Sequence, residues 1–396
     1  MEQTWRWFGP KDPVPLAHVR QAGATGVVSA LHDHYRGEVW PEEGIAERKR
    51  VIEAAGLRWS VVESIPVPNA IKLGGEPARE ATAAWVETMR RLSRAGLRTI
   101  CYNFMPVVDW TRTELRHPMP AGGLALRFDM VDFVAYDAFV LERSGAAGDY
   151  RADLVTRAEE RVRELTPEQV QRLEATIIAG LPGSEDSHSR AGIADVIARY
   201  RDIGPDDLRA SLRTFHETVV PIARELGVRL CIHPDDPPFP LFGLPRVVST
   251  ASDLDAIFGA VPERENGLTF CAGSFGSRDD NDLPALLSAW ADRVHFVHLR
   301  NVSTDPDGSF VEDDHLVGNA DMVRLLAILL QEEARRRDEG REDHRIPFRP
   351  DHGHLLLDDQ SKVTLPGYSA VGRLKGLAEL RGILQALTHP TYGVLQ

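Results

Sequence analysis

The chain has 396 residues, of which 43% are apolar and 27% are charged, so it can bury a large core. Its formal net charge of -13 argues against a binding surface for nucleic acid or an anionic membrane, and no cluster of basic residues offsets it. The N-terminus lacks an apolar signal region, and no apolar run is long enough to span a bilayer, so we expect a cytoplasmic protein. Three scattered cysteines, Cys101, Cys231 and Cys271, fit a reducing compartment.

Short apolar stretches alternate with helical segments along most of the chain. Several of these stretches are apolar almost throughout, as expected of parallel strands covered on both faces. Amphipathic segments rich in Glu, Arg and Ala separate them, and three of these end in the phrases AAGLR, RAGLR and ELGVR, in which Gly is expected to cap the helix. The pattern predicts an α/β protein with a (β/α)8 barrel. The eight expected strands are 5–8, 26–31, 58–64, 98–104, 228–233, 268–271, 294–299 and 346–349.

One segment interrupts this alternation. Residues 105–205 contain no convincing strand, but they contain helical stretches at 132–143, 152–165 and 167–179 and loop signals at SGAAGD and GLPGSEDSHS. We therefore expect residues 1–396 to form one barrel domain with a large, mainly helical insertion in the fourth βα connection. In a barrel such an insertion lies near the C-terminal rim, so we predict a lid or a subunit contact in a homo-oligomer.

Four of the expected strands lead directly into a side chain that can bind a metal ion. They end at His233, Cys271, His298 and Asp351. Taken singly, a histidine here is more often a structural residue and a cysteine a small core residue. Together, at the C-terminal ends of four successive strands, they predict a shared metal site. The mixed donor set is too soft for a typical Mg²⁺ site and fits Mn, Fe(II), Co or Zn.

Other polar residues near these strand ends have two interpretations. Arg300 follows His298 by two residues and shares its strand face, so it could pair with a substrate carboxylate or form a structural salt bridge. His32 and His34 could contact substrate or be ordinary loop histidines. The two aspartates of HPDDPP could touch substrate or form the turn beside the prolines.

Several longer motifs resemble the mannonate dehydratase family. They are HPDDPP, CAGSFG, FVHLRN, RPDHGH and PGYSAVGRLKGLAELRG, with VVESIPV, YNFMPVVDWTRT and LRFDMVDF upstream. The resemblance runs from residue 5 to the C-terminal helix. It implies a xylose-isomerase-like barrel that converts the small sugar acid D-mannonate to 2-keto-3-deoxy-D-gluconate in hexuronate (glucuronate) breakdown. It also implies Mn²⁺ as the cofactor, with Fe²⁺ or Co²⁺ as alternatives.

The resemblance implies roles for individual residues. It gives His233, Cys271, His298 and Asp351 as metal ligands, and His352 and Tyr368 as the acid and base in an unassigned order. We also expect Asn103 and Arg300 to contact the substrate. Removing water from a sugar acid needs such groups, because the proton beside the carboxylate is weakly acidic and hydroxide is a poor leaving group.

Two other functions remain open from the sequence. A metal-dependent sugar isomerase or epimerase would use the same kind of barrel and would also move a proton next to a carbonyl. A catalytically inactive relative could serve as a binding or regulatory protein, although the intact candidate ligands together with His352 and Tyr368 argue against it.

Overall fold

Eight parallel strands form a closed barrel, which confirms the predicted fold. The computed structural model describes residues 1–179, 189–391 and 393. Each barrel strand pairs in parallel with both neighbours, in the order β1-β12-β9-β8-β7-β4-β3-β2. Every strand overlaps its expected range. The barrel strands are β1 (Glu2–Arg6), β2 (Gly26–Ser29), β3 (Arg58–Glu63), β4 (Thr99–Tyr102), β7 (Arg229–Ile232), β8 (Asn266–Cys271), β9 (Val294–His298) and β12 (Pro347–Arg349).

Helices surround the barrel, and the main apolar core lies between them and the strands. Gly56, Gly96 and Gly227 follow α2, α4 and α9 with φ of 71°, 85° and 64°, a left-handed conformation that confirms the predicted glycine caps. The surrounding helices are α1 (Leu16–Gln21), α2 (Glu42–Ala54), α3 (Asn69–Leu73), α4 (Glu76–Arg94), α9 (Pro205–Leu226), α10 (Ala251–Ala260), α11 (Ala272–Gly276), α12 (Leu283–Trp290), α13 (Met322–Asp338) and α14 (Ala370–Leu387), with 3-10 turns at Ala291–Arg293 and Leu357–Ser361.

The connection after β4 carries the large helical segment. The prediction that this segment contains no strand is wrong. Two antiparallel strands, β5 (Glu114–Pro118) and β6 (Leu124–Phe128), precede its helices. The sequence of β5, ELRHP, is mostly polar, and the apolar sequence of β6, LALRF, is short and interrupted by Arg127, so neither gives a clear strand signal. The helices are α5 (Met130–Ala135), which continues into a π turn at Tyr136–Val140, then a 3-10 turn at Ala146–Gly148, α6 (Ala152–Glu164), α7 (Pro167–Ala179) and α8 (Arg190–Arg199). Most of the predicted GLPGSEDSHS loop lies outside the described residues.

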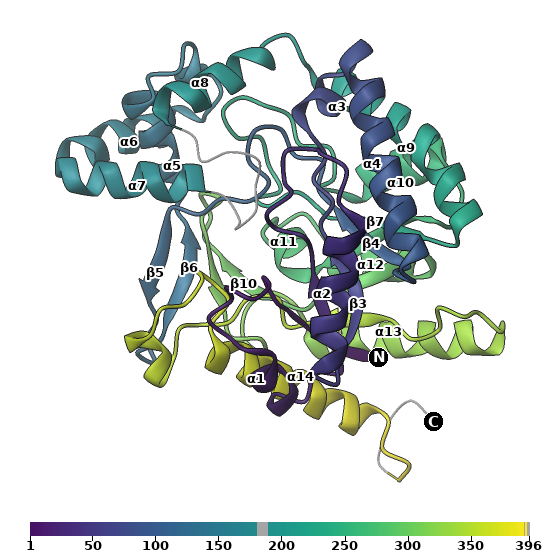
Figure 1. Cartoon of the computed structure of the whole chain (residues 1–396). Helices are drawn as coiled ribbons and strands as arrows, with labels where there is room; N and C mark the ends of the chain where they lie inside the picture. The colour runs from purple at the N-terminus through teal and green to yellow at the C-terminus, as the bar shows by residue number, and fades with distance from the viewer. Residues whose placement is uncertain (180–188, 392, 394–396) are drawn as a thin grey trace.

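A second, smaller sheet joins two distant parts of the chain. Strands β10 (Asn301–Thr304) and β11 (Phe310–Asp313) follow β9, and β11 pairs with β6 to give the order β10-β11-β6-β5. We call these four strands the auxiliary sheet. In Figure 1, helices α5 to α8 gather in a lobe beside β5 and β6, on the side opposite α9 and α10. The auxiliary sheet therefore links this lobe to the loop after β9.

The barrel interior is filled by a compact apolar cluster. Its members come from five strands: Val28, Val61, Cys101, Cys231 and Phe296. Cys101 and Cys231 are thus core residues, as predicted. No helix in the described part of the chain is long and apolar enough to cross a membrane.

Helix α14 packs closely against His315, which lies in the loop after β11. A methyl group added at Gly376 would lie 2.2 Å from Cε1 of His315, whose Nε2 is 2.7 Å from the Pro350 carbonyl oxygen. At Gly382, in the same helix, the position of a methyl group has no atom within 4 Å.

We expect Gly376→Ala to lower the free energy of unfolding by about 1–3 kcal/mol, because the methyl group must displace a buried imidazole. Gly382→Ala should raise it by about 0.5–1 kcal/mol, since alanine favours the helix and nothing obstructs it. Urea denaturation of both variants measures the difference. Equal effects of the two substitutions would contradict this packing.

Candidate active site

Alternation along the strands places the four predicted ligands at one end of the barrel. Side chains two residues apart point to the same side of a strand. Cys231 and Phe296 lie in the interior cluster, so His233 and His298 lie above them at the strand ends. Cys271 ends β8, directly opposite His298 in the strand register. This end is the C-terminal rim, where barrel active sites form.

The structure brings His233, Cys271 and His298 together. Their possible ligand atoms all lie within 4.8 Å of one another. The nearest pair is Nε2 of His233 and Nδ1 of His298, 3.0 Å apart. Asp351 lies beside them, with Oδ2 3.9 Å from Sγ of Cys271 and Oδ1 3.8 Å from Nδ1 of His298. We call these four residues the rim cluster.

Second contacts direct the donor atoms of the rim cluster inward. Nδ1 of His233 is 2.7 Å from the Pro234 carbonyl oxygen. A carbonyl only accepts, so Nδ1 carries the proton and the Nε2 lone pair faces the cluster. The backbone N–H and the hydroxyl of Ser274 lie 3.4 and 3.2 Å from Sγ of Cys271 and can donate to the sulfur. Two imidazoles, one thiol and one carboxylate so arranged fit a divalent cation of intermediate softness.

Asp351 reaches the cluster through an unusual backbone conformation. Its φ is 65°, in the left-handed region that few residues other than glycine adopt. Such conformations cost of order 1–3 kcal/mol and concentrate at functional sites. Burial disfavours the Asp351 carboxylate, but the charges of Arg349, His352 and other neighbours outweigh burial and hold its pKa well below the usual range. The residue is therefore ionised at neutral pH.

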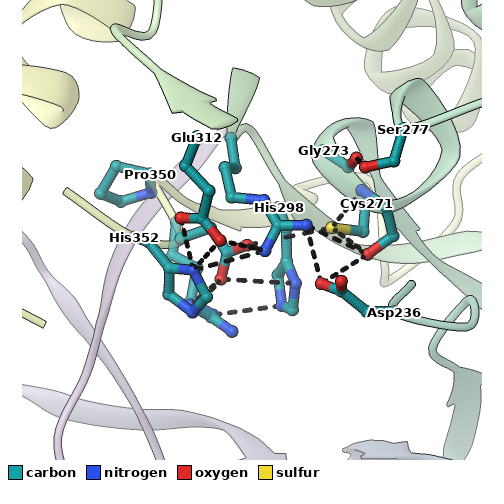
Figure 2. Close-up of polar contacts among 12 residues, drawn as sticks. Asp236, Cys271, Gly273, Ser277, His298, Glu312, Pro350 and His352 are labelled. Carbon is teal, nitrogen blue, oxygen red and sulfur yellow. Dashed lines mark hydrogen bonds and ion pairs between the residues drawn. The ribbon is translucent and has the colours of Figure 1, made fainter. Parts of the chain in front are cut away.

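His352 and Tyr368 form a pair beside the rim cluster. Nε2 of His352 is 3.2 Å from the Tyr368 hydroxyl, and both side chains are buried. Nδ1 of His352 lies 2.8 and 2.9 Å from the two carboxylate oxygens of Glu312 (Figure 2). Burial raises the pKa of the Tyr368 phenol, more than Arg6 and Arg349 lower it. The phenol therefore keeps its proton at neutral pH.

The two predicted substrate contacts have different surroundings. Arg300 is 2% exposed and forms ion pairs with Asp236 at 2.8 Å, Glu312 at 3.2 Å and Asp351 at 3.3 Å. These are the structural salt bridges considered as its alternative role. Asn103 is half-buried and donates weakly to Asp109, at 3.4 Å. Contact of either residue with substrate stays a prediction.

The remaining polar residues considered from the sequence include His32, Asp235 and Asp236. His32 packs against Phe8, with ring centroids 5.1 Å apart, and burial together with Arg6 and Arg48 lowers its pKa well below the usual range. Asp235 accepts from the backbone N–H of Val248 and the hydroxyl of Ser249, so it stabilises the turn. Asp236 instead faces the site.

Sequence reasoning missed the charged groups that surround the cluster. Arg112 pairs with Asp236 at 2.7 Å and with Glu312 at 2.7 Å, and Arg349 pairs with Glu63 at 2.9 Å. Glu63 and Arg349 end β3 and β12, so their strand-end position was an available signal. Glu312 and Arg112 carried no such signal, because the auxiliary sheet brings them together across 200 positions of sequence.

A closed parallel barrel with buried acid–base groups and a candidate metal cluster at its C-terminal rim is the architecture of a TIM-barrel enzyme. The sequence model of D-mannonate dehydratase (UxuA) matches residues 1–392. This chain belongs to the D-mannonate dehydratase family.

Individual relatives agree over nearly the whole chain. Mannonate dehydratase 2 of Agrobacterium fabrum is 55% identical, covering 98% of this chain and 97% of that protein. Mannonate dehydratase of Saccharophagus degradans is 50% identical, covering 98% of each chain. The crystal structure of mannonate dehydratase from Streptococcus suis serotype 2 is similar with a TM-score of 0.75 at 32% identity, covering 98% of this chain and 93% of that one.

Asp236 and Glu312 give the site a defined response to acid. Burial opposes the ionisation of both carboxyls, but nearby charges outweigh it. Arg112 and Arg300 lower the pKa of Asp236. His352, together with the same two arginines, lowers the pKa of Glu312 to about 2. A carboxyl whose pKa is lowered by folding contributes stability above its unfolded value, and that stability is lost as the pH falls towards the folded value.

We therefore expect the free energy of unfolding to fall between pH 4.5 and 3, by at most about 1.4 kcal/mol per pH unit for each such group. Asp236→Asn should be less stable at pH 7 but should show a shallower fall. Urea denaturation at several pH values measures both slopes. If the unfolding free energy of the variant fell with pH as steeply as that of the parent, the arginines would not be lowering the pKa of Asp236.

Proposed function

We propose that this protein is a metal-dependent lyase that dehydrates D-mannonate to 2-keto-3-deoxy-D-gluconate. The observation that carries the proposal is the hydrogen-bonded pair of His352 and Tyr368 beside the rim cluster. Membership of the D-mannonate dehydratase family and relatives of that name support it. An isomerase or epimerase is not favoured, because the named relatives over the whole chain are dehydratases.

In this proposal His233, Cys271, His298 and Asp351 hold Mn²⁺, or alternatively Fe²⁺ or Co²⁺. When bound, such an ion supplies a positive charge that stabilises the negative charge developing on the substrate. The donor set supports a cation softer than Mg²⁺ and does not choose among these three. Arg300 and Asn103 would lie against the substrate.

The chain's own residues handle two protons. One group takes the proton from C2, and the other gives a proton to the C3 hydroxyl, which leaves as water; the resulting enol becomes the 2-keto acid. The proposed role of His352 and Tyr368 is supported by their burial and by the 3.2 Å separation of Nε2 and the phenol oxygen.

Incubating the purified protein with D-mannonate and Mn(II) tests the proposal. The expected product is a 2-keto-3-deoxy acid, lighter than the substrate by one water, whereas an isomerase or epimerase product would keep the mass. Conversion without loss of water, or no conversion with any of the three metals, would contradict it.

The ligand assignment has a matched control within the chain. Cys271→Ser should lose most of its bound metal on dialysis and most of its activity, because the hydroxyl is a far weaker ligand than the thiolate. Cys101→Ser, in the interior cluster, should retain both. Elemental analysis after dialysis compares them. Equal metal content in the two variants would remove Cys271 from the site.

We also propose that residues 105–205 act as a lid or a subunit contact in a homo-oligomer. Strand β6 of this segment pairs with β11, and Glu312 of β11 contacts His352. This pairing supports a position of the segment near the rim. Location in the cytoplasm is supported by the free, buried cysteines, and a place in hexuronate (glucuronate) catabolism by the proposed substrate.

Amide hydrogen exchange tests the lid or contact role. Helices α6 and α7 should exchange faster than the barrel strands in the free protein and should become protected when a substrate analogue binds or subunits associate. Protection equal to that of the strands and unchanged by ligand and protein concentration would contradict both roles.

A further inference from the structure

Glu312 reaches His352 from outside the barrel. It lies on β11, opposite Val302 of β10, and is 3% exposed. Its backbone is anchored as well, because Nε2 of His354 is 2.8 Å from its carbonyl oxygen. This side chain thus comes from the auxiliary sheet and not from one of the barrel strands.

The two carboxylate oxygens of Glu312 have different partners. Oε1 accepts from Arg112, at 2.7 and 3.1 Å, and from Arg300, at 3.2 Å, and lies 2.9 Å from Nδ1 of His352. Oε2 lies 2.8 Å from the same Nδ1, its hydrogen-bond partner among the described residues. The arginines therefore hold one oxygen and leave the other for the imidazole.

A carboxylate surrounded by donors fixes the proton on the imidazole. Arg112 and Arg300 beside Oε1 keep the Glu312 carboxyl ionised, and an ionised carboxylate only accepts hydrogen bonds. Nη1 of Arg300 also lies 3.3 Å from Nδ1 of His352, but both Glu312 oxygens are closer to that nitrogen. Nδ1 must then carry the proton, which leaves a lone pair on Nε2, 3.2 Å from the Tyr368 hydroxyl. We infer that Glu312 is a positioning residue that sets the tautomer of His352, so that Nε2 faces Tyr368 as a proton acceptor. This inference rests on the proposed function.

Replacing Glu312 by glutamine keeps the shape of the side chain but removes its charge and replaces one accepting oxygen with a donating NH₂ group. Arg112 and Arg300 can only donate, so they select the amide oxygen of the new side chain in place of Oε1. The amide NH₂ then occupies the place of Oε2 and donates to Nδ1. His352 must shift its proton to Nε2, which can no longer accept from Tyr368. In serine proteases, a substitution that leaves histidine in the wrong tautomer costs about 10⁴-fold in turnover.

The test is a double-mutant cycle on the metal-loaded, full-length enzyme. Glu312→Gln should reduce kcat for D-mannonate by roughly 10²- to 10⁴-fold and change KM by less than about threefold. Its metal content should stay close to that of the parent, whereas its unfolding midpoint should fall, because the buried guanidiniums of Arg112 and Arg300 lose a charged partner. In a His352→Asn background, the same substitution should change kcat by less than about threefold, because Glu312 acts through His352.

Asp313→Asn is the matched control. Asp313 neighbours Glu312 on β11 and accepts from the hydroxyl of Ser303 at 2.6 Å. It should keep the parental kcat. Product formed over long incubations at high enzyme concentration measures the slow His352→Asn variants.

Two results would overturn the inference alone: a Glu312→Gln enzyme with kcat within about threefold of the parent, or an equal loss in the parent and His352→Asn backgrounds. The second result would make Glu312 a purely structural partner of the arginines. A parent enzyme that forms no keto acid from D-mannonate would overturn the proposed function, and this inference with it.

Discussion

Mutual compensation of buried charges is the constraint on which the candidate active site depends. Removing one partner of a buried ion pair typically costs about 3–5 kcal/mol, because the other charge is left in a poorly solvated place. The C-terminal rim buries several such charges together, and each carboxylate there meets at least one guanidinium. The carboxylates are Glu63, Asp236, Glu312 and Asp351, and the guanidiniums are those of Arg6, Arg112, Arg300 and Arg349. The network keeps the carboxylates ionised although they are buried.

The network also connects parts of the fold that the chain keeps far apart. Arg112 lies before β5, Asp236 follows β7 and Glu312 lies on β11, yet all three are joined by hydrogen bonds. The auxiliary sheet makes this possible, because β6 from the large insertion pairs with β11 from the loop after β9. The insertion is therefore connected to His352 through Glu312, even if no residue of the insertion touches the substrate.

The barrel and the rim cluster were accessible to sequence reasoning for a simple physical reason. Parallel strands covered on both faces are nearly continuous apolar runs, and their ends meet at one rim, so the polar residue after each run could be assigned to a shared site. His233, Cys271 and His298 follow this rule. The auxiliary strands do not: β5 is half-exposed, and its register depends on a partner that local sequence does not reveal. Glu312 was missed for the same reason.

The location of the bound metal tests the central claim most directly. Crystals grown with Mn(II), measured on both sides of the manganese absorption edge, would show the ion by its anomalous scattering. The expected peak lies among Nε2 of His233, Sγ of Cys271, the imidazole of His298 and the carboxylate of Asp351. A peak at another position in catalytically active crystals would contradict the assignment of these residues as the metal site.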